Sequence, residues 1–330
     1  MNGGRRYPAV FTVQTWSDRA MKIVVLGSAA GGGFPQWNSN AAGCRRARAG
    51  DPKAAPRTQA SIAVSQDGVF WFVFNASPDI RQQIEANAML HPNGAIRSTP
   101  IAGVVLTNGD VDALAGLLTL RERQAFTVYA TSRVHGILND NPIFEVLARD
   151  VVERRTIPAS GPFALTLPGG EPSGLTVEFF PVPGKVPLYL EQEGLLMNAP
   201  APVEEGEQTV GAAISDGRRT VCFIPACAMM TDSLRQRLAG ADTVFFDGTL
   251  WSDDEMIRAG LVPKTGRRMG HMSVSGEDGT IAAFRDLGVR QKILIHINNS
   301  NPVLLEDSAE RAEALAAGWT VAHDGMQIEL

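Results

Sequence analysis

The sequence predicts an α/β fold in which two β-sheets pack against each other with helices on the outside. Short runs rich in β-branched residues mark buried strands, strand–helix pairs follow a first hairpin, and the same alternation returns in the second half of the chain. The chain has 330 residues, of which 44% are hydrophobic and 20% charged. This globular composition can bury a sizeable core in one large domain or two average ones.

The first predicted strand, 22–26, leads into the glycine-rich loop 27–35. Glycines let backbone N–H groups approach an anion, but this spacing fits neither the dinucleotide-binding pattern nor the Walker pattern. Pro35 also prevents a helix from starting directly after the glycines. We therefore expect a tight turn or a substrate-contacting loop here, not a nucleotide loop.

Predicted strands and helices follow one another along the rest of the chain. In order, we predict a hairpin of strands 58–64 and 68–74, a helix opened by Asn75-Ala76-Ser77-Pro78-Asp79, a strand 101–105 followed by an apolar helix, a strand 127–130, a helix 142–152, strands 175–182, 211–215, 220–224 and 243–249, a helix around 281–284, a strand 292–296, and a hairpin turn 322–326 before the last strand. The segment 191–208 is rich in Glu, Pro, Ala and Gly, which indicates an exposed insertion.

Bulk properties exclude several classes of function. The net charge of −5 argues against a nucleic-acid partner, which would require a basic face. Three cysteines, an odd number, fit a reducing compartment, and no apolar run is long enough to span a membrane. We expect a cytoplasmic protein with a poorly ordered extension at 1–20 and one domain at 21–330, with Met21 as an alternative start.

A strand-to-helix turn carries the clearest chemical signal. It is Asn108-Gly109-Asp110-Val111-Asp112-Ala113, directly after the strand 101–105. Metal-dependent hydrolases of the metallo-β-lactamase type have His-x-His-x-Asp-His at the corresponding turn, so the histidine ligands are replaced in this chain. The alternative interpretation is a surface turn in which Asp112 caps the following helix.

Two of the five histidines are candidates for chemistry. His296 ends an apolar strand and precedes a polar turn, which suits a metal ligand or a general base. His271 precedes a helix, and Gly270 beside it allows close approach from the other side. For His91, His135 and His323 we expect structural roles, with His91 and His135 solvated.

Acidic residues at strand ends complete the candidate site. Asp110 and Asp247 both end apolar strands, and buried carboxylates are costly unless they are paired with a cation. Asp110, Asp112 and His296 would form a metal-binding set of one histidine and two carboxylates.

Several long segments resemble the pyrroloquinoline quinone (PQQ) biosynthesis protein B family over residues 21–330. They are KIVVLGSAAGGGFPQW at 22–37, NASPDIR at 75–81, the turn 106–112, VPGKVP at 182–187, FDGT at 246–249, the segment 269–271 and HINNSNP at 296–302. The resemblance implies a metallo-β-lactamase-like αββα sandwich, with two mixed β-sheets packed face to face and helices outside.

The resemblance also implies a function. An iron-dependent oxygenase would hydroxylate the tyrosine of a Glu–Tyr-derived PQQ precursor, and other PQQ-pathway proteins or a second copy of the chain would be its partners. The alternative is a non-catalytic carrier that takes PQQ or its precursor towards the periplasm. A metal-dependent hydrolase is disfavoured because histidines are missing.

The resemblance assigns roles to individual residues. Asp110, Asp112 and His296 would hold Fe(II), His271 and Asp247 would be catalytic, and Gly31, Gly32, Gly33, Arg81 and Asn298 would bind the substrate. Two departures matter. The family usually has His at the position of Ala113, and the loss of this imidazole would weaken metal binding and favours the carrier function. The family also usually has a cysteine cluster that binds zinc, of which only Cys44 remains here, so no structural zinc is expected.

Overall fold

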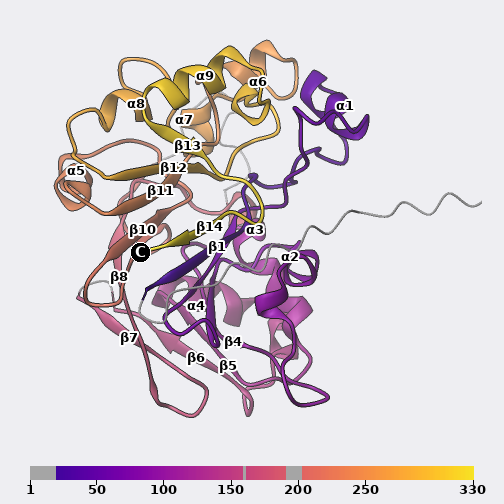
Figure 1. Ribbon diagram of the computed structural model, residues 1–330, viewed down its shortest axis with the longest axis vertical. Coiled ribbons are helices and arrows are strands. Elements are labelled where there is room, and N and C mark those ends of the chain that lie inside the picture. The colour runs from indigo at the N-terminus through magenta and orange to yellow at the C-terminus, as the bar shows by residue number, and fades with distance from the viewer. Residues whose placement is uncertain (1–19, 159–160, 191–202) are drawn as a thin grey trace, which may run out of the picture.

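The computed structural model describes residues 20–158, 161–190 and 203–330, which form two seven-stranded sheets packed face to face (Figure 1). The strand orders are β14-β1-β2-β3-β4-β5-β6 and β13-β12-β11-β10-β9-β8-β7. Both sheets are mixed: β3 to β6 are parallel in the first sheet, and β10 to β13 are parallel in the second. The predicted sandwich of two mixed sheets with helices outside is confirmed.

The strands agree with the predicted ones over most of the chain. The first sheet contains β1 (Lys22–Gly27), β2 (Ser61–Ser65), β3 (Trp71–Phe74), β4 (Ile101–Val105), β5 (Phe126–Ala130), β6 (Val152–Thr156) and β14 (Gln327–Glu329). The second contains β7 (Phe163–Thr166), β8 (Pro172–Pro181), β9 (Val210–Ser215), β10 (Thr220–Ile224), β11 (Thr243–Asp247), β12 (Gln291–Ile295) and β13 (Trp319–Val321).

The helices are short and lie on the two outer faces (Figure 1). The α-helices are α1 (Ala42–Arg48), α2 (Ile80–Ala86), α3 (Val111–Leu114), α4 (Ser132–Asp140), α5 (Asp232–Leu238), α6 (Glu255–Arg258), α7 (Gly266–Met269), α8 (Thr280–Ala283) and α9 (Ala309–Ala316). The 3₁₀ helices are η1 (Ala88–Leu90), η2 (Ala115–Leu120), η3 (Pro142–Val146), η4 (Leu188–Leu190) and η5 (Pro302–Leu304). Within the described ranges, no helix has the length and apolarity needed to cross a membrane.

Three apolar layers hold the sandwich together. In β11, Phe245 faces the layer between the two sheets, whereas Val244 and Phe246 face the helices outside the second sheet. The first sheet alternates in the same way, with Phe72 inside and Val73 under the helices. Both faces of each sheet are therefore buried, which explains why the strands consist of nearly continuous apolar runs.

Two predicted elements are wrong. The helix expected at 142–152 is only the 3₁₀ helix η3, and Val152 begins β6, which pairs with β5 in parallel. The hairpin turn expected at 322–326 joins the two sheets instead, because β13 belongs to the second sheet and β14 pairs with β1 in the first. In both cases, pairing with a strand distant in sequence outweighs the local pattern.

The environment of His135 also differs from the expectation. It lies on α4 as expected, but it is 7% exposed, and its Nε2 lies 3.0 Å from the carbonyl oxygen of Arg155. His135 is therefore a buried residue and not a solvated one. The expected extension at 1–20, except its last residue, and most of the expected insertion at 191–208 lie outside the described residues.

We predict that Gly116→Ala destabilises the fold, because the added Cβ would lie 2.1 Å from the carbonyl oxygen of Ser77. The clash should lower the free energy of unfolding by about 1–3 kcal/mol in urea denaturation. Gly136→Ala is the matched control: a Cβ there meets no atom within 4 Å, and helix propensity favours alanine by about 1 kcal/mol. Equal midpoints for the two variants would contradict this account of η2 packing.

Candidate active site

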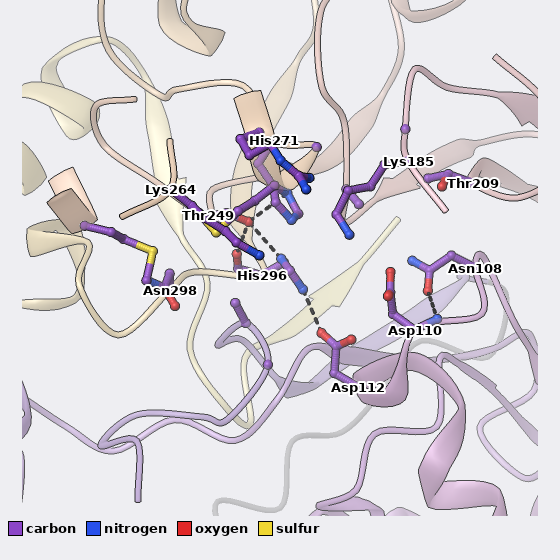
Figure 2. Close-up of a pocket in the computed structure, with 18 of the residues that line it drawn as sticks. Asn108, Asp110, Asp112, Lys185, Thr209, Thr249, Lys264, His271, His296 and Asn298 are labelled. Carbon is purple, nitrogen blue, oxygen red and sulfur yellow. Dashed lines mark hydrogen bonds and ion pairs between the residues drawn. The ribbon is translucent and has the colours of Figure 1, made fainter. Parts of the chain in front are cut away.

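The candidate site lies where β4, β11 and β12 end. β11 and β12 are parallel, so their carboxyl ends are adjacent, and Asp247 pairs with Ile295 in the last rung. Asp110 lies between β4 and α3, on the other sheet. The two sheets thus present polar side chains to one cavity of about 400 Å³ (Figure 2).

His296 directly follows β12 in an unusual backbone conformation. Its φ is +57°, a left-handed value that costs a non-glycine residue roughly 1–2 kcal/mol. The next residue is held by two hydrogen bonds, from Ile297 N to Ser28 O at 3.0 Å and from Ala30 N to Ile297 O at 2.8 Å. This strained turn directs the imidazole into the cavity, and such strain is typical of functional sites.

Asp247 is a buried carboxylate with all its hydrogen-bonding capacity used. It is 0% exposed. Its Oδ1 accepts from Thr249 N at 2.9 Å and Thr249 Oγ1 at 2.6 Å, and its Oδ2 accepts from Cys227 N at 2.9 Å and His271 Nδ1 at 2.6 Å. Burial disfavours the anion, but the charges of His271 and His296 and these hydrogen bonds outweigh it and hold the pKa of Asp247 below its ordinary value.

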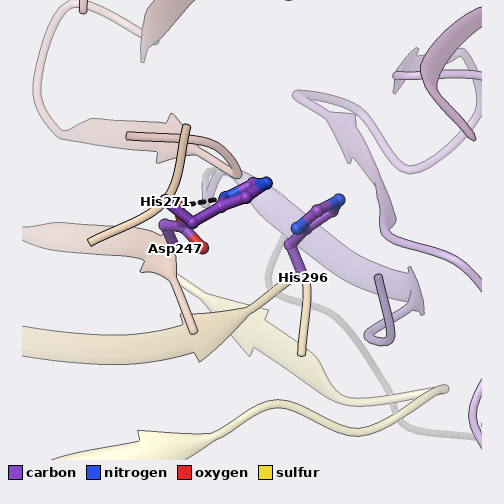
Figure 3. A group of neighbouring side chains, drawn as sticks. All are labelled: Asp247, His271 and His296. Atoms are coloured by element: carbon purple, nitrogen blue, oxygen red, sulfur yellow. Dashed lines mark hydrogen bonds and ion pairs between the residues drawn. The ribbon is translucent and has the colours of Figure 1, made fainter. Parts of the chain in front are cut away.

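Thr249 connects Asp247 to the second histidine. Its Oγ1 donates to Asp247 and lies 2.8 Å from His296 Nδ1, which can donate to it. The two imidazole rings stack with centroids 5.3 Å apart. Figure 3 shows Asp247 on one side of both rings and the two Nε2 atoms on the opposite side. Both histidines therefore use Nδ1 for support and present Nε2 to the cavity.

The carboxylates of the first sheet face these Nε2 atoms. Asp112 Oδ2 lies 2.8 Å from His296 Nε2, which joins residues 184 positions apart. Burial and the neighbouring Asp112 charge raise the pKa of Asp110. For Asp112, burial acts in the same sense but the hydrogen bond and charge of His296 outweigh it and lower the pKa. Burial lowers the pKa of His296, but the hydrogen bond and charge of Asp112 outweigh burial and raise it.

The donor set can hold a metal ion. The ligand atoms of Asp247, His271 and His296 lie within 4.8 Å of one another. Because Asp247 is fully buried and already accepts four hydrogen bonds, we assign the ion to the other side of the rings. On that side, Nε2 of His296 lies against the carboxylate of Asp112, Nε2 of His271 faces the same way, and Asp110 lines the same cavity.

The residues expected to bind substrate are only partly brought together. Gly31 and Asn298 line the cavity, and a Cβ on Gly31 would lie 3.6 Å from Asp112 Oδ2. Gly32 and Gly33 form the turn beside it, with φ of +90° and +71°, and are not among the lining residues described. Arg81 is exposed on α2 and does not line the cavity either.

Two other predicted positions lie outside the cavity lining. Ala113 is 3% exposed, and its carbonyl oxygen accepts from Ala76 N at 2.7 Å. Cys44 is buried on α1, where its Sγ lies 3.6 Å from Asn299 Oδ1. Ala113 is therefore buried and is not among the residues that line the cavity.

Sequence reasoning missed several lining residues, namely Asn108, Lys185, Thr209, Thr249, Lys264 and Arg268. A signal existed for three of them: Asn108 opens the turn 108–113, Thr249 lies within the FDGT segment and Lys185 lies within VPGKVP. Gly270 offered another, because a Cβ there would lie 3.0 Å from Lys185 Cγ. The close approach expected at Gly270 is made by the side chain of Lys185.

Comparison with known proteins identifies the family of the chain. The model of the beta-lactamase superfamily domain matches residues 70–297. The coenzyme PQQ synthesis protein B of Gluconacetobacter diazotrophicus is 63% identical over 306 residues, covering 93% of this chain and 98% of that protein. The protein of the same name from Methylorubrum populi is 53% identical over 311 residues, covering 94% and 100%.

Solved structures with the same fold lead to the same family. The Zn²⁺-bound PqqB from Methylobacterium extorquens matches with a TM-score of 0.89 and 52% identity, covering 94% of this chain and 100% of that one. A diphosphatase of the PhnP family shares the fold, with a TM-score of 0.63, 20% identity, and coverage of 94% and 97%. The chain belongs to the coenzyme PQQ synthesis protein B family of the beta-lactamase superfamily.

Proposed function

We propose that this protein takes part in PQQ synthesis as an Fe(II)-dependent oxygenase acting on a tyrosine-containing precursor. The observation that carries the proposal is the orientation of the histidines. His271 and His296 are anchored through Nδ1 on Asp247 and Thr249, and both Nε2 atoms face the cavity beside Asp112. Two histidines and a carboxylate are the ligand set of many non-haem iron oxygenases.

The proposal revises two roles expected from the sequence. His271 becomes a metal ligand and not a proton carrier, because its Nε2 faces the same side as that of His296. Asp247 becomes a positioning residue that sets the ring orientation and tautomer of both histidines. The Zn²⁺ bound in the relative from Methylobacterium extorquens supports a divalent ion in this fold.

In this proposal, the metal ion and the cavity carboxylates have different roles. When bound, ferrous iron would supply dioxygen activation. Asp110 is the cavity carboxylate with no hydrogen bond to a histidine among the described residues, so it can complete the metal site or accept the proton of a substrate phenol. Burial and the charge of Asp112 raise the pKa of Asp110, which is the direction that makes a carboxylate a stronger proton acceptor.

A carrier function is the second candidate. The ion pair between Asp112 and His296 satisfies both groups in the absence of metal. A protein that only bound and released PQQ or its precursor would not need a metal ion to complete these contacts. A hydrolase is disfavoured, because Asn108 and Asp110 stand where metal-dependent hydrolases have histidines.

We predict that anaerobically reconstituted protein retains about one Fe(II) per chain and consumes oxygen when Glu–Tyr is added. His271→Ala and Asp112→Asn should each weaken iron binding about 100-fold or more, because each removes a proposed ligand. Arg81→Ala is the control and should behave like wild type, because Arg81 is exposed and outside the cavity. Metal analysis and an oxygen electrode provide the two measurements. Iron-free protein that binds PQQ tightly would establish the carrier instead.

We also predict that Thr249→Val weakens metal binding by about 10–100-fold, because the hydroxyl between Asp247 and His296 is lost while the shape is kept. Competition with a chelating dye measures the affinity. Thr209→Val removes another hydroxyl that lines the cavity but makes no hydrogen bond to either histidine, so it should leave the affinity unchanged. Equal losses in both variants would show that Thr249 does not orient His296.

A further inference from the structure

The left-handed turn at His296 is held by a segment of the first sheet. Ile297, the next residue, exchanges two backbone hydrogen bonds with the segment 28–30, which directly follows β1. Its N–H donates to Ser28 O at 3.0 Å, and its carbonyl oxygen accepts from Ala30 N at 2.8 Å. Ala30 also lines the cavity. The direction of the His296 ring therefore depends on where the segment 28–30 lies.

The segment 28–30 is held in turn by the residues that precede β2. Ser28 N and Ala29 N both donate to Thr58 O, at 3.0 and 2.8 Å. Ala29 forms one parallel bridge with Gln59 and another with Ile297, so the segment lies between the start of β2 and the end of β12. It joins the two sheets beside the cavity. A shift of Thr58 would move Ser28 and, through it, the residue after His296.

One carboxylate, that of Asp324, fixes both Ser28 and Thr58. Asp324 lies between β13 and β14, where the chain passes from the second sheet to the first. Its Oδ1 accepts from Ser28 Oγ at 2.8 Å, and its Oδ2 accepts from Thr58 N at 2.7 Å and Thr58 Oγ1 at 2.8 Å. Ser28 is fully buried and Asp324 is half-buried. Asp324 is not among the cavity-lining residues described, so it can affect the site only through these partners.

We propose that Asp324 is a positioning residue for the candidate metal site. Its carboxylate fixes Ser28 and Thr58, and these fix the backbone that directs the His296 ring into the cavity. A left-handed conformation is costly for histidine and persists only where its surroundings enforce it. The inference deepens the proposed function and rests on it for the role of His296 as a ligand. The alternative is that Asp324 stabilises only the turn in which it lies.

Amide hydrogen exchange of the metal-free, full-length protein, followed by mass spectrometry, distinguishes the two roles. Asp324→Asn keeps the shape of the side chain but replaces one accepting oxygen by a donor, so it breaks hydrogen bonds to Ser28 or Thr58. Exchange should become about tenfold faster in the peptides that contain Ala30 and Ile297, because their amide bonds to each other's segment loosen.

Asp67→Asn is the matched control. Asp67 also accepts three hydrogen bonds in a turn, from Ser65 Oγ, Val69 N and Phe70 N, but this turn lies at the end of β2 opposite to Thr58. The control substitution should destabilise its own turn and leave exchange in the peptides around residues 30 and 297 unchanged.

Zn²⁺ affinity, measured by competition with a chelating dye, provides a second readout. Asp324→Asn should weaken Zn²⁺ binding about tenfold, because the histidine is less well oriented, and Asp67→Asn should not change it. Ser28→Ala removes one hydrogen bond to Asp324 and should act in the same direction with a smaller effect. It should add little to Asp324→Asn, since both substitutions break the same link.

Several results would overturn the positioning role. They are equal effects of Asp324→Asn and Asp67→Asn around residue 297, unchanged exchange or unchanged Zn²⁺ affinity in Asp324→Asn, and full additivity of Asp324→Asn with Ser28→Ala. If Asp324→Asn does not fold, Ser28→Ala decides by the same two measurements. If the wild-type protein binds no Zn²⁺, the proposed metal site fails, and the exchange result alone decides the role of Asp324.

Discussion

The burial of one carboxylate, Asp247, is the constraint on which the rest of the site depends. An unpaired buried anion would cost several kcal/mol, so its surroundings must satisfy it. Four donors do so, and they come from Cys227, Thr249 and His271. Each donor is fixed by the bond it makes. The need to satisfy Asp247 thus sets the orientation of one histidine directly and of the other through a threonine hydroxyl.

The topology makes this arrangement possible. β11 and β12 are parallel neighbours, so the residues that follow them emerge together. The opposite sheet contributes α3, which carries Asp112 to within 2.8 Å of His296. A left-handed residue at His296 completes the geometry. The site therefore lies at an edge shared by both halves of the sandwich, with the two histidines on one half and Asp110 and Asp112 on the other.

Membership in the coenzyme PQQ synthesis protein B family fits the chemistry of the cavity. Carboxylates and an asparagine occupy the turn at 108–112 where related hydrolases have histidines, and this changes the donor set from nitrogen-rich to mixed. Lys185 and Lys264 line the same cavity.

Sequence alone determined the two-sheet architecture, most strands, and the set of acids and histidines at strand ends, because apolar periodicity and its polar interruptions are local properties. It did not predict the edge strands β6 and β7, which are more polar than the buried central strands, and it misplaced the 322–326 turn, because β13 and β14 belong to different sheets. Only the tertiary structure decided that Asp247 supports the histidines from behind, that Arg81 lies outside the cavity, and that Lys185 and Lys264 lie inside it. The direction of a side chain depends on the residues packed around it, and those come from other segments of the chain, as His271 does for Asp247 and Gly270 for Lys185.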